Sequence, residues 1–456
     1  FVPLFAGRLQ QDGREAARAY AGEVAAVMVG WMLFLTLLAM ATMPWLMLGL
    51  AWGWTDQPAK FDLAVGLTRI TFPYLMFMVL TAMLSGMLNA LGRFAVAAAA
   101  PVLLNVVLIT ALLLVQRGTI AAAGPALAWA VAIAGVVQFL WLVVACRRLD
   151  ILPRLPRPRL TPDVRRLLVL MLPGVLGAGV VHINLLIDAF LATLLPEGSL
   201  SFLFLADRLN QFPLGVVGVS VGVALLPLMT RQLRAGEDAA AAHNQNRAIE
   251  FALFLTVPAA AAFLVIGGPI IHVVFERGDF LPEHTPQTAM ALAAFAVGLP
   301  AAVLIKAFQP GFYAREDTVT PFKIGAAAVV LNVLAAVTLM QFILHVGIAL
   351  ATSVAYWFNA IMLGWVLHRR GQFQADERLM KRVPLIVFCA AVMATAVWWL
   401  ALILAEPLAG ALWQKVAALA ALVAAGGAIY GGLVVATGAM RLSDLSQLRR
   451  RPAPPA

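Results

Sequence analysis

The sequence predicts an all-α polytopic membrane protein. Of its 456 residues, 62% are hydrophobic and only 12% are charged, and the mean hydropathy is +0.92. Soluble globular chains carry about 25% charged residues, so this chain has too few to cover a surface that faces water. Its apolar segments are long and continuous rather than short and alternating, which favours spanning helices over a membrane barrel.

Twelve apolar segments are long enough to cross a bilayer, which takes about 20 helical residues. Glycine, charged residues or histidine mark the turns between them, and a helical stub at roughly Phe1–Gln10 precedes them. In chain order, the spans are predicted at about Val24–Leu50, Ala64–Leu91, Ala95–Val115, Pro125–Cys146, Leu167–Leu195, Phe202–Met229, Ile249–Val274, Ala289–Tyr313, Ile324–Leu344, Gly347–Leu367, Leu385–Leu404 and Trp413–Thr437.

The basic residues predict the orientation of these helices. Of the 32 lysines and arginines, 25 fall in one set of alternating loops and tails, 4 in the opposite set and 3 within spans. Cytoplasmic loops carry the excess of Lys and Arg, so the Arg-rich loops and the C-terminus are predicted to face the cytoplasm. The net charge of +10 therefore indicates a surface that faces anionic lipid, and nucleic acid is not an expected partner.

Two short matches indicate an internal duplication. The stretch that begins at Pro227 echoes the one at Pro3, at an offset of 224 residues. Asn332 likewise echoes Asn105, at an offset of 227. This offset spans six helices, which gives both copies the same orientation and makes a parallel repeat. The second copy begins near Arg165, so we expect one whole helix and most of another to precede the first residue in the full-length protein. The alternative is natural divergence of the first copy, with a true start near the first residue.

The predicted fold is two pseudo-repeated six-helix bundles plus two C-terminal helices, with the first helix and most of the second missing. Five regions follow from it. They are the remainder of an N-terminal helical lobe (1–149), a basic, Pro-rich cytoplasmic linker (150–164), a C-terminal helical lobe (165–370), two additional transmembrane helices (371–440) and a basic cytoplasmic tail (441–456).

Ionisable side chains inside spans are costly, and they mark candidate functional sites. Asp207, Arg208 and Gln211 border one face of a helix, where the guanidinium is suited to bind two phosphate oxygens. Lys306 lies mid-span in another helix, and we expect it to face the same wet cavity. The alternatives are a structural pair between Asp207 and Arg208, and a lysine that extends to the membrane surface.

A second polar group predicts a cation site. Asn184 and Asp188 share a helix face at i and i+4, and Asn332 and Thr352 on two adjacent helices could add oxygen ligands. Sodium is the cation expected there, and it is the only cofactor that we expect. The alternative is a protonated or hydrogen-bonded aspartate with a structural role. The sequence has no nucleotide-binding loop and no metalloenzyme motif, so transport is expected rather than enzymatic catalysis.

Several motifs resemble the MurJ (MviN) family of lipid II flippases. They are Thr71-Phe-Pro-Tyr74, Gly86-Met-Leu-Asn89, Gly92-Arg-Phe94, Ala206-Asp-Arg-Leu209 with Phe212-Pro213, and Gly311-Phe-Tyr-Ala-Arg315 followed by Asp317, Thr320-Pro321 and Lys323-Ile324. The resemblance runs in order over essentially the whole chain. It implies the multidrug/oligosaccharidyl-lipid/polysaccharide exporter superfamily, whose MurJ members have two six-helix lobes and two further helices.

The resemblance also implies a function. Such proteins flip the undecaprenyl-pyrophosphate-linked peptidoglycan precursor across the bacterial inner membrane by alternating access, for cell-wall synthesis. Membrane lipids and cell-wall synthesis proteins are the other expected partners. Arg208 matches a cavity arginine and would contact the pyrophosphate, and Lys306 lies where the family tends to carry a basic residue. Asp188, Asn332 and Thr352 match positions of the family's sodium site.

This chain departs from the family pattern at two positions. Ala336 stands where a polar sodium ligand is often seen, and Gln211 replaces a common acidic residue. Other cavity residues of the family lie on the two helices missing here, so we expect the 456-residue chain not to flip substrate by itself. The alternative functions are a cation-coupled multidrug or lipid-linked oligosaccharide exporter of the same superfamily, and a non-transporting membrane scaffold for cell-wall enzymes.

Overall fold

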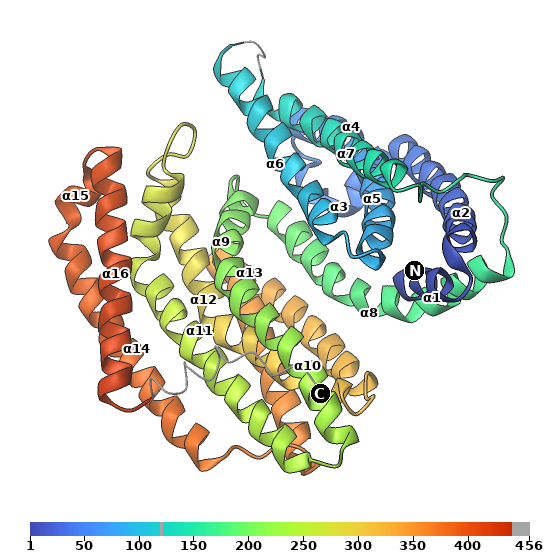
Figure 1. Ribbon diagram of the computed structural model, residues 1–456. Coiled ribbons are helices and arrows are strands. Elements are labelled where there is room, and N and C mark those ends of the chain that lie inside the picture. Colours follow the sequence, from blue (N-terminus) through green and yellow to red (C-terminus); the bar gives the residue numbers. More distant parts are fainter. Residues whose placement is uncertain (119–121, 440–456) are drawn as a thin grey trace. The chain divides into compact units, whose positions relative to one another are not determined.

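The computed structural model describes residues 1–118 and 122–439, except for the side chains of 172–183, 219–220 and 223–224. Within these residues all regular secondary structure is helical (Figure 1). Nine stretches of the described chain are long and apolar enough to cross a membrane. The all-α polytopic membrane fold is therefore confirmed. The predicted tail 441–456 lies outside the described residues, and the helices expected ahead of the first residue stay a prediction.

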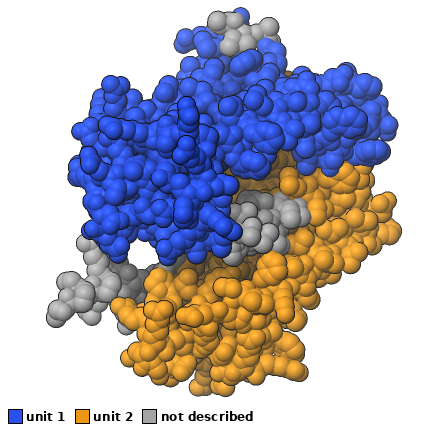
Figure 2. All heavy atoms as spheres, turned by 90° about the vertical axis from the view of Figure 1, so that its right-hand side faces the viewer, with its two compact units in different colours: residues 1–179 blue, residues 180–456 orange. Residues whose placement is uncertain are grey.

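The chain divides into two compact units, residues 1–179 and 180–456, which Figure 2 colours blue and orange. The division falls within α8 (Pro162–Thr193). The lobe boundary at residue 165, which was inferred from the repeat, stays a prediction. Because α8 contributes to both units, each unit is described below by itself.

Unit 1 contains the helices that precede α8. They are α1 (Val2–Gln11), α2 (Gly13–Ala41), α3 (Met43–Leu50), the short 3-10 helix η1 (Trp52–Trp54), α4 (Pro58–Thr71), α5 (Pro73–Ala90), α6 (Phe94–Gln116) and α7 (Ala123–Arg148). Two predicted spans are interrupted here, at Thr42 and at Phe72, and in each case a proline is one of the first two residues of the next helix. Proline lacks the backbone N–H that would continue the helix, which explains both breaks.

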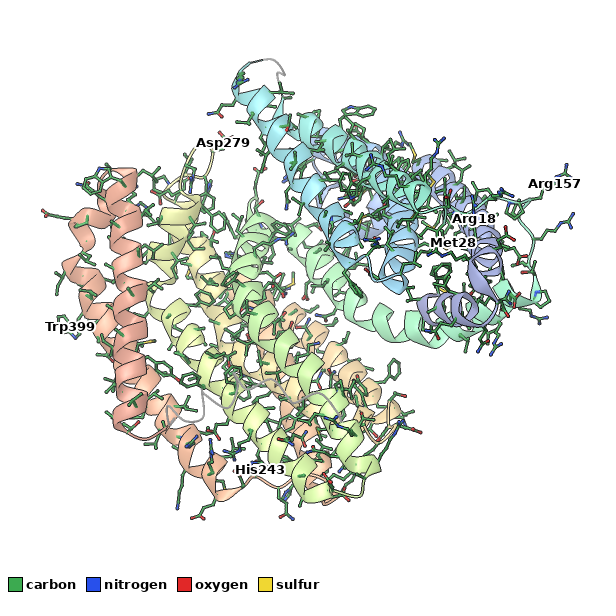
Figure 3. All side chains as sticks on the ribbon, in the orientation of Figure 1. Arg18, Met28, Arg157, His243, Asp279 and Trp399 are labelled. Atoms are coloured by element: carbon green, nitrogen blue, oxygen red, sulfur yellow. The ribbon has the colours of Figure 1, made fainter. Side chains whose placement is uncertain are left out.

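The basic linker packs directly on α2 in unit 1. The Thr161 hydroxyl donates to the Glu23 carboxylate at 2.8 Å. A Cβ added to Gly22 would lie 2.1 Å from the carbonyl oxygen of Arg154, so only glycine permits this approach of linker and helix. Arg157 extends from the linker away from the helices (Figure 3). The linker thus lies along the helix surface and presents its arginines outward.

Unit 2 contains the remaining helices. They are the end of α8, α9 (Ser199–Pro213), the π-helical turn η2 (Leu214–Gly218), α10 (Val219–Arg234), α11 (Asp238–Phe275), α12 (His284–Tyr313), α13 (Val319–Arg369), α14 (Glu377–Ile403), α15 (Ala405–Ala409) and α16 (Leu412–Ala436). Helix α12 is the centre of this unit, packed against α9, α10, α11 and α13. The pair α14 and α16 packs against α11 at one edge (Figure 1), and Trp399 of α14 points away from the bundle (Figure 3).

Helix α13 contains two of the predicted spans. Its 51 residues are interrupted at Ile343 and Leu344, and Leu344 has a φ of +50°. A Cβ on Gly347 would lie 2.5 Å from the carbonyl carbon of Leu339, so the chain turns back tightly on itself at this point. The two spans predicted at 324–344 and 347–367 are therefore two helical segments joined by this turn.

A buried ionic cluster joins α11 to the start of α14. We define it as Arg247, Glu250, Asp376, Arg378 and Arg382. Glu250 is only 3% exposed, and its carboxylate pairs with three guanidiniums, that of Arg378 at 3.1 Å. Asp376 pairs with Arg247 and also caps α14, because its carboxylate accepts from the backbone N–H of Leu379 at 2.7 Å. The cluster therefore ties the C-terminal helix pair to the rest of unit 2.

Asp317 joins the two ends of α13. Its carboxylate accepts from the Thr320 hydroxyl at 2.7 Å and from the Arg370 guanidinium at 2.7 Å. These two partners, Thr320 first, lower the pKa of Asp317 from 3.8 to about 2. A lowered pKa adds stability above the unfolded value of 3.8, and that contribution is lost as the pH falls through about 2.

We predict that Asp317→Asn lowers the free energy of unfolding by about 1 kcal/mol at neutral pH, a modest value because the pair is partly solvated. The difference from the unchanged protein should shrink as the pH falls below 3.8 and vanish near 2. Thermal melting of the detergent-solubilised proteins over this pH range measures it. A difference that stays constant down to the lowest pH would contradict this account of Asp317.

Candidate functional site

The predicted cation ligands come together inside unit 2. We call Asn184, Asp188, Asn332 and Thr352 the Asp188 cluster. The Asn332 amide donates to the Asp188 carboxylate at 2.9 Å and to the Asn184 side-chain oxygen at 2.8 Å. Asn184 and Thr352 donate to the other carboxylate oxygen at 3.3 and 3.4 Å. Residues more than 140 positions apart in the sequence thus surround one carboxylate.

One oxygen of this cluster has no hydrogen-bond partner. The side-chain oxygen of Asn332 is fully buried and accepts no bond from any described residue. A buried acceptor without a donor is costly, and a cation is one group that would satisfy it. Ala336, one turn further along α13, is 0% exposed and offers no ligand. The cluster therefore has the oxygen atoms that a cation needs, once the Asn332 amide turns its oxygen toward Asp188 in place of its N–H group. It has one side-chain ligand fewer than a polar residue at 336 would allow.

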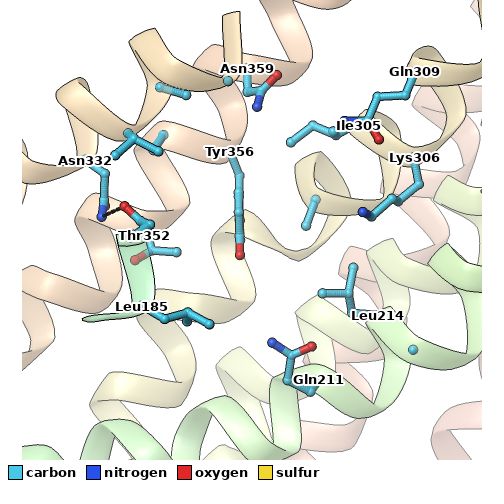
Figure 4. Close-up of a pocket in the computed structure, with 17 residues that line it drawn as sticks. Leu185, Gln211, Leu214, Ile305, Lys306, Gln309, Asn332, Thr352, Tyr356 and Asn359 are labelled. Carbon is cyan, nitrogen blue, oxygen red and sulfur yellow. Dashed lines mark hydrogen bonds between the residues drawn. The ribbon is translucent and has the colours of Figure 1, made fainter. Parts of the chain in front are cut away.

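A cavity of about 410 Å³ adjoins the Asp188 cluster (Figure 4). We call it the Lys306 cavity. It is lined by α8, α9, η2, α12 and both segments of α13, all from unit 2. Its polar lining residues are Asn184, Gln211, Lys306, Gln309, Asn332, Thr352, Tyr356 and Asn359. Because Asn184, Asn332 and Thr352 belong to both, the cavity and the cluster share a wall.

Lys306 is the charged group of this cavity. It is exposed although its neighbours Ile305 and Ala307 are buried, because its side chain faces the open space. Its stem lies beside η2, where a Cβ on Gly218 would meet it at 3.6 Å. A π-helical turn such as η2 often occurs at functional sites. No described residue pairs with the Lys306 ammonium, so the alternative in which it reaches the membrane surface has less in its favour than the cavity role.

The structure separates Arg208 from the Lys306 cavity. Arg208 is exposed, its guanidinium lies 4.8 Å from the centre of the Phe204 ring, and it does not line the cavity. Asp207 accepts a hydrogen bond from Gln211 at 3.3 Å and makes no ion pair with Arg208 among the described contacts. Asp207, Arg208 and Gln211 were predicted to share a helix face. Of these three, Gln211 lines the cavity, and its amide donates to the Asp207 carboxylate. The guanidinium of Arg208 is available to a ligand outside it.

Three lining residues were missed by the sequence analysis. Gln309 lies one turn after Lys306 on α12, and Tyr356 and Asn359 follow Thr352 on α13 at i+4 and i+7. This spacing is a polar stripe on one face of an apolar helix. The stripe can be read from the sequence, but its residues do not stand out as ionisable residues within spans do, because neutral side chains are less costly inside a membrane.

Comparisons with known proteins decide the family. The model of the family described as "Lipid II flippase MurJ" matches residues 1–413.

The chain belongs to the MurJ family.

A probable lipid II flippase MurJ of Rhizobium meliloti (strain 1021) is 44% identical, over 99% of this chain and 85% of the relative. The lipid II flippase MurJ of Burkholderia cenocepacia is 32% identical, over 95% of this chain and 85% of the relative. The match therefore extends along nearly the whole sequence.

Solved structures agree on the fold. The lipid II flippase MurJ in an inward closed conformation has a TM-score of 0.76 at 21% identity, and covers 99% of this chain and 88% of that one. An inward-facing multidrug resistance MATE family transporter of the MOP superfamily has a TM-score of 0.66 at 16% identity, and covers 83% and 86% of the two chains. The MurJ-family chain thus shares the fold of these two structures.

Proposed function

We propose that this protein flips lipid II, the undecaprenyl-pyrophosphate-linked peptidoglycan precursor, from the inner to the outer leaflet of the bacterial inner membrane. The MurJ-family relatives carry that activity in their names, and a flippase is a transporter rather than an enzyme. The observation in this chain that supports the proposal most is the Lys306 ammonium. Lys306 lies in the middle of a spanning helix, and its ammonium faces the cavity and has no partner among the described residues.

Each step of the proposed cycle has a physical requirement. A headgroup that leaves water loses hydration, and fixed cations must replace it. Arg208 and Lys306 supply that charge, and the prenyl chain stays in the lipid. Alternating access then moves the site from one side to the other, and a ligand shifts this equilibrium only through different affinities for the two states. We place the C-terminus in the cytoplasm, following the distribution of basic residues.

Depletion of the cell's own flippase tests the function. Cells that express the full-length protein in its place should expose newly made precursor headgroups on the outer leaflet and should grow. Substitutions in the Lys306 cavity should abolish this rescue, whereas substitutions on the lipid-facing surface should not. The scaffold alternative predicts the reverse pattern, and rescue by every cavity variant would favour it.

The Asp188 cluster would hold a sodium ion. Its ligands would be the Asp188 carboxylate, the buried Asn332 oxygen and the Thr352 hydroxyl, with Asn184 beside them. The ion would neutralise a carboxylate that is otherwise costly within the membrane. In the structure the Asn332 amide donates to this carboxylate, so its oxygen would have to rotate toward the ion.

We predict that sodium raises the melting temperature of the purified protein and that Asp188→Asn abolishes this shift. A ligand present at 100 times its dissociation constant stabilises by about 2.7 kcal/mol. Potassium at equal ionic strength is the control for salt effects, and Asp207→Asn is the control for loss of a carboxylate in the same unit. The proposed sodium site would be wrong if sodium and potassium raised the melting temperature equally. It would also be wrong if the sodium-dependent rise in melting temperature persisted in Asp188→Asn.

A further inference from the structure

Among the residues that the structure describes, the lining of the Lys306 cavity carries a single fixed positive charge. Seventeen described residues line the cavity, and Lys306 is the one Lys, Arg, Asp or Glu among those seventeen. Arg208 lies outside. The two basic residues assigned to the headgroup are therefore separate, and each can contact a different part of the same ligand.

The rest of the polar lining is neutral, and three of its side chains lack partners among the described residues. Gln309, Tyr356 and Asn359 make no hydrogen bond with a described residue, and the Asn359 side-chain oxygen is buried without a donor. Figure 4 shows these groups on two helices, with Lys306 across the open space from Tyr356. Side-chain amides and a phenol each donate and accept, so their best partners are other amides and hydroxyls. Unpaired groups of this kind converge where a ligand supplies the missing bonds.

The surroundings disfavour a diphosphate in this cavity. Two carboxylates stand directly behind the lining, because Asp188 bonds to Thr352 and Asn332, and Asp207 bonds to Gln211. A diphosphate brings at least two negative charges, and the one Lys306 ammonium cannot balance both of them. Even with a sodium ion on Asp188, the Asp207 carboxylate remains behind the lining and repels an anion with excess charge. A carboxylate brings one charge, which Lys306 balances one to one.

The size of the cavity points the same way. Pockets that bind small molecules occupy about 300–1,000 Å³, and this one holds about 410 Å³. It admits one or two amino-acid residues but not a complete glycopeptide headgroup. A short peptide with a carboxylate offers the single charge, the amides and the size that this lining requires.

We propose that the Lys306 cavity binds a carboxylate and the adjoining amides of the peptide that the lipid-linked precursor carries, while Arg208 contacts the diphosphate. Lys306 pairs with the carboxylate, and Gln309 and Asn359 bond to the peptide amides. This inference rests on the proposed function and adds to it a peptide subsite within the C-terminal lobe. The cavity thereby discriminates between headgroups that share the same diphosphate.

The test is the binding of two lipids to the full-length protein in nanodiscs. Both carry the same prenyl diphosphate and sugars, and they differ in whether the peptide carboxylates are free or converted to carboxamides. The unchanged protein should prefer the free carboxylates by about ten- to a hundredfold, the worth of one hydrogen bond to a charged group. Lys306→Gln should bring this ratio close to one, and Lys306→Arg should retain most of it.

Three further variants make the result decisive. Arg208→Ala should weaken both lipids by the same factor and keep the ratio. Asn359→Leu should weaken the binding of both peptide-bearing lipids relative to that of a third lipid that lacks the peptide. This variant still tests the peptide subsite if Lys306→Gln fails to fold. Thr338→Val, an exposed position whose hydroxyl bonds only within its own helix, should match the unchanged protein.

Two results would overturn the inference. One is that the unchanged protein binds the carboxylate and carboxamide lipids equally well. The other is that Lys306→Gln weakens the binding of both lipids by the same factor, which would assign Lys306 to the diphosphate. Failure of the proposed function looks different, because the unchanged protein would then bind none of the three lipids. The inference would fall with it.

Discussion

Replacing Glu250 by alanine should lower the free energy of unfolding by about 3–5 kcal/mol, the usual cost of removing one partner from a buried ion pair. Three guanidiniums, those of Arg247, Arg378 and Arg382, share this carboxylate, which is only 3% exposed. Without it, they lose their common counter-charge and repel one another around a buried position. Thermal melting in detergent, together with proteolysis between α11 and α14, measures the loss.

Glu377→Ala is the matched control for this prediction. Glu377 pairs with Lys381 at 2.5 Å, on the same helix as two of the three arginines. The side chains of Glu377 and Lys381 are both largely exposed. Exposed pairs contribute about 0–1 kcal/mol, so this variant should melt almost as the unchanged protein does. Equal melting temperatures for the two variants would show that the ionic cluster does not hold the C-terminal helix pair in place.

Arg208→Ala should reduce flipping at least tenfold while leaving the amount of protein in the membrane unchanged. The guanidinium is exposed and forms no ion pair with a described residue, so its removal costs little stability. A hydrogen bond to a charged group contributes about 1.5–3 kcal/mol, and 1.4 kcal/mol is a factor of ten. Rescue of flippase-depleted cells, normalised to the amount of full-length protein, measures the effect.

Arg208→Lys separates charge from geometry at the same position. Lysine keeps the positive charge but loses the planar fork that binds two phosphate oxygens at once, so it should restore only part of the activity. Full rescue by Arg208→Ala would remove this residue from the substrate path. Loss of the protein from the membrane would instead indicate a structural role.

Hydropathy predicted most of the fold because a bilayer demands long apolar helices, and each of the twelve predicted spans falls on helical chain. The breaks at Thr42 and Phe72 were missed because an apolar run containing proline still satisfies a hydropathy count. The turn at Leu344 lies between two predicted spans, where a single histidine and a glycine were the only signals. The positions of the helices could thus be predicted from the sequence, but the breaks within the predicted spans could not.

The site was only partly predictable. The spacing of Asn184 and Asp188 is local and can be read from the sequence, whereas their meeting with Asn332 depends on how α8 and α13 pack. The ionic cluster around Glu250 was not foreseen, because arginines at the membrane edge are expected for topology alone. Neutral residues such as Asn359 do not stand out until a cavity shows that they lack partners.

The most direct test of the central claim is translocation of lipid II by the purified full-length protein in proteoliposomes. The claim is that fixed positive charge inside the helical bundle receives the headgroup and carries it across. We predict protein-dependent, saturable appearance of headgroups on the opposite leaflet, lost when Arg208 and Lys306 are both replaced by neutral residues. An equal rate in protein-free vesicles, or an unchanged rate in the double variant, would contradict the account.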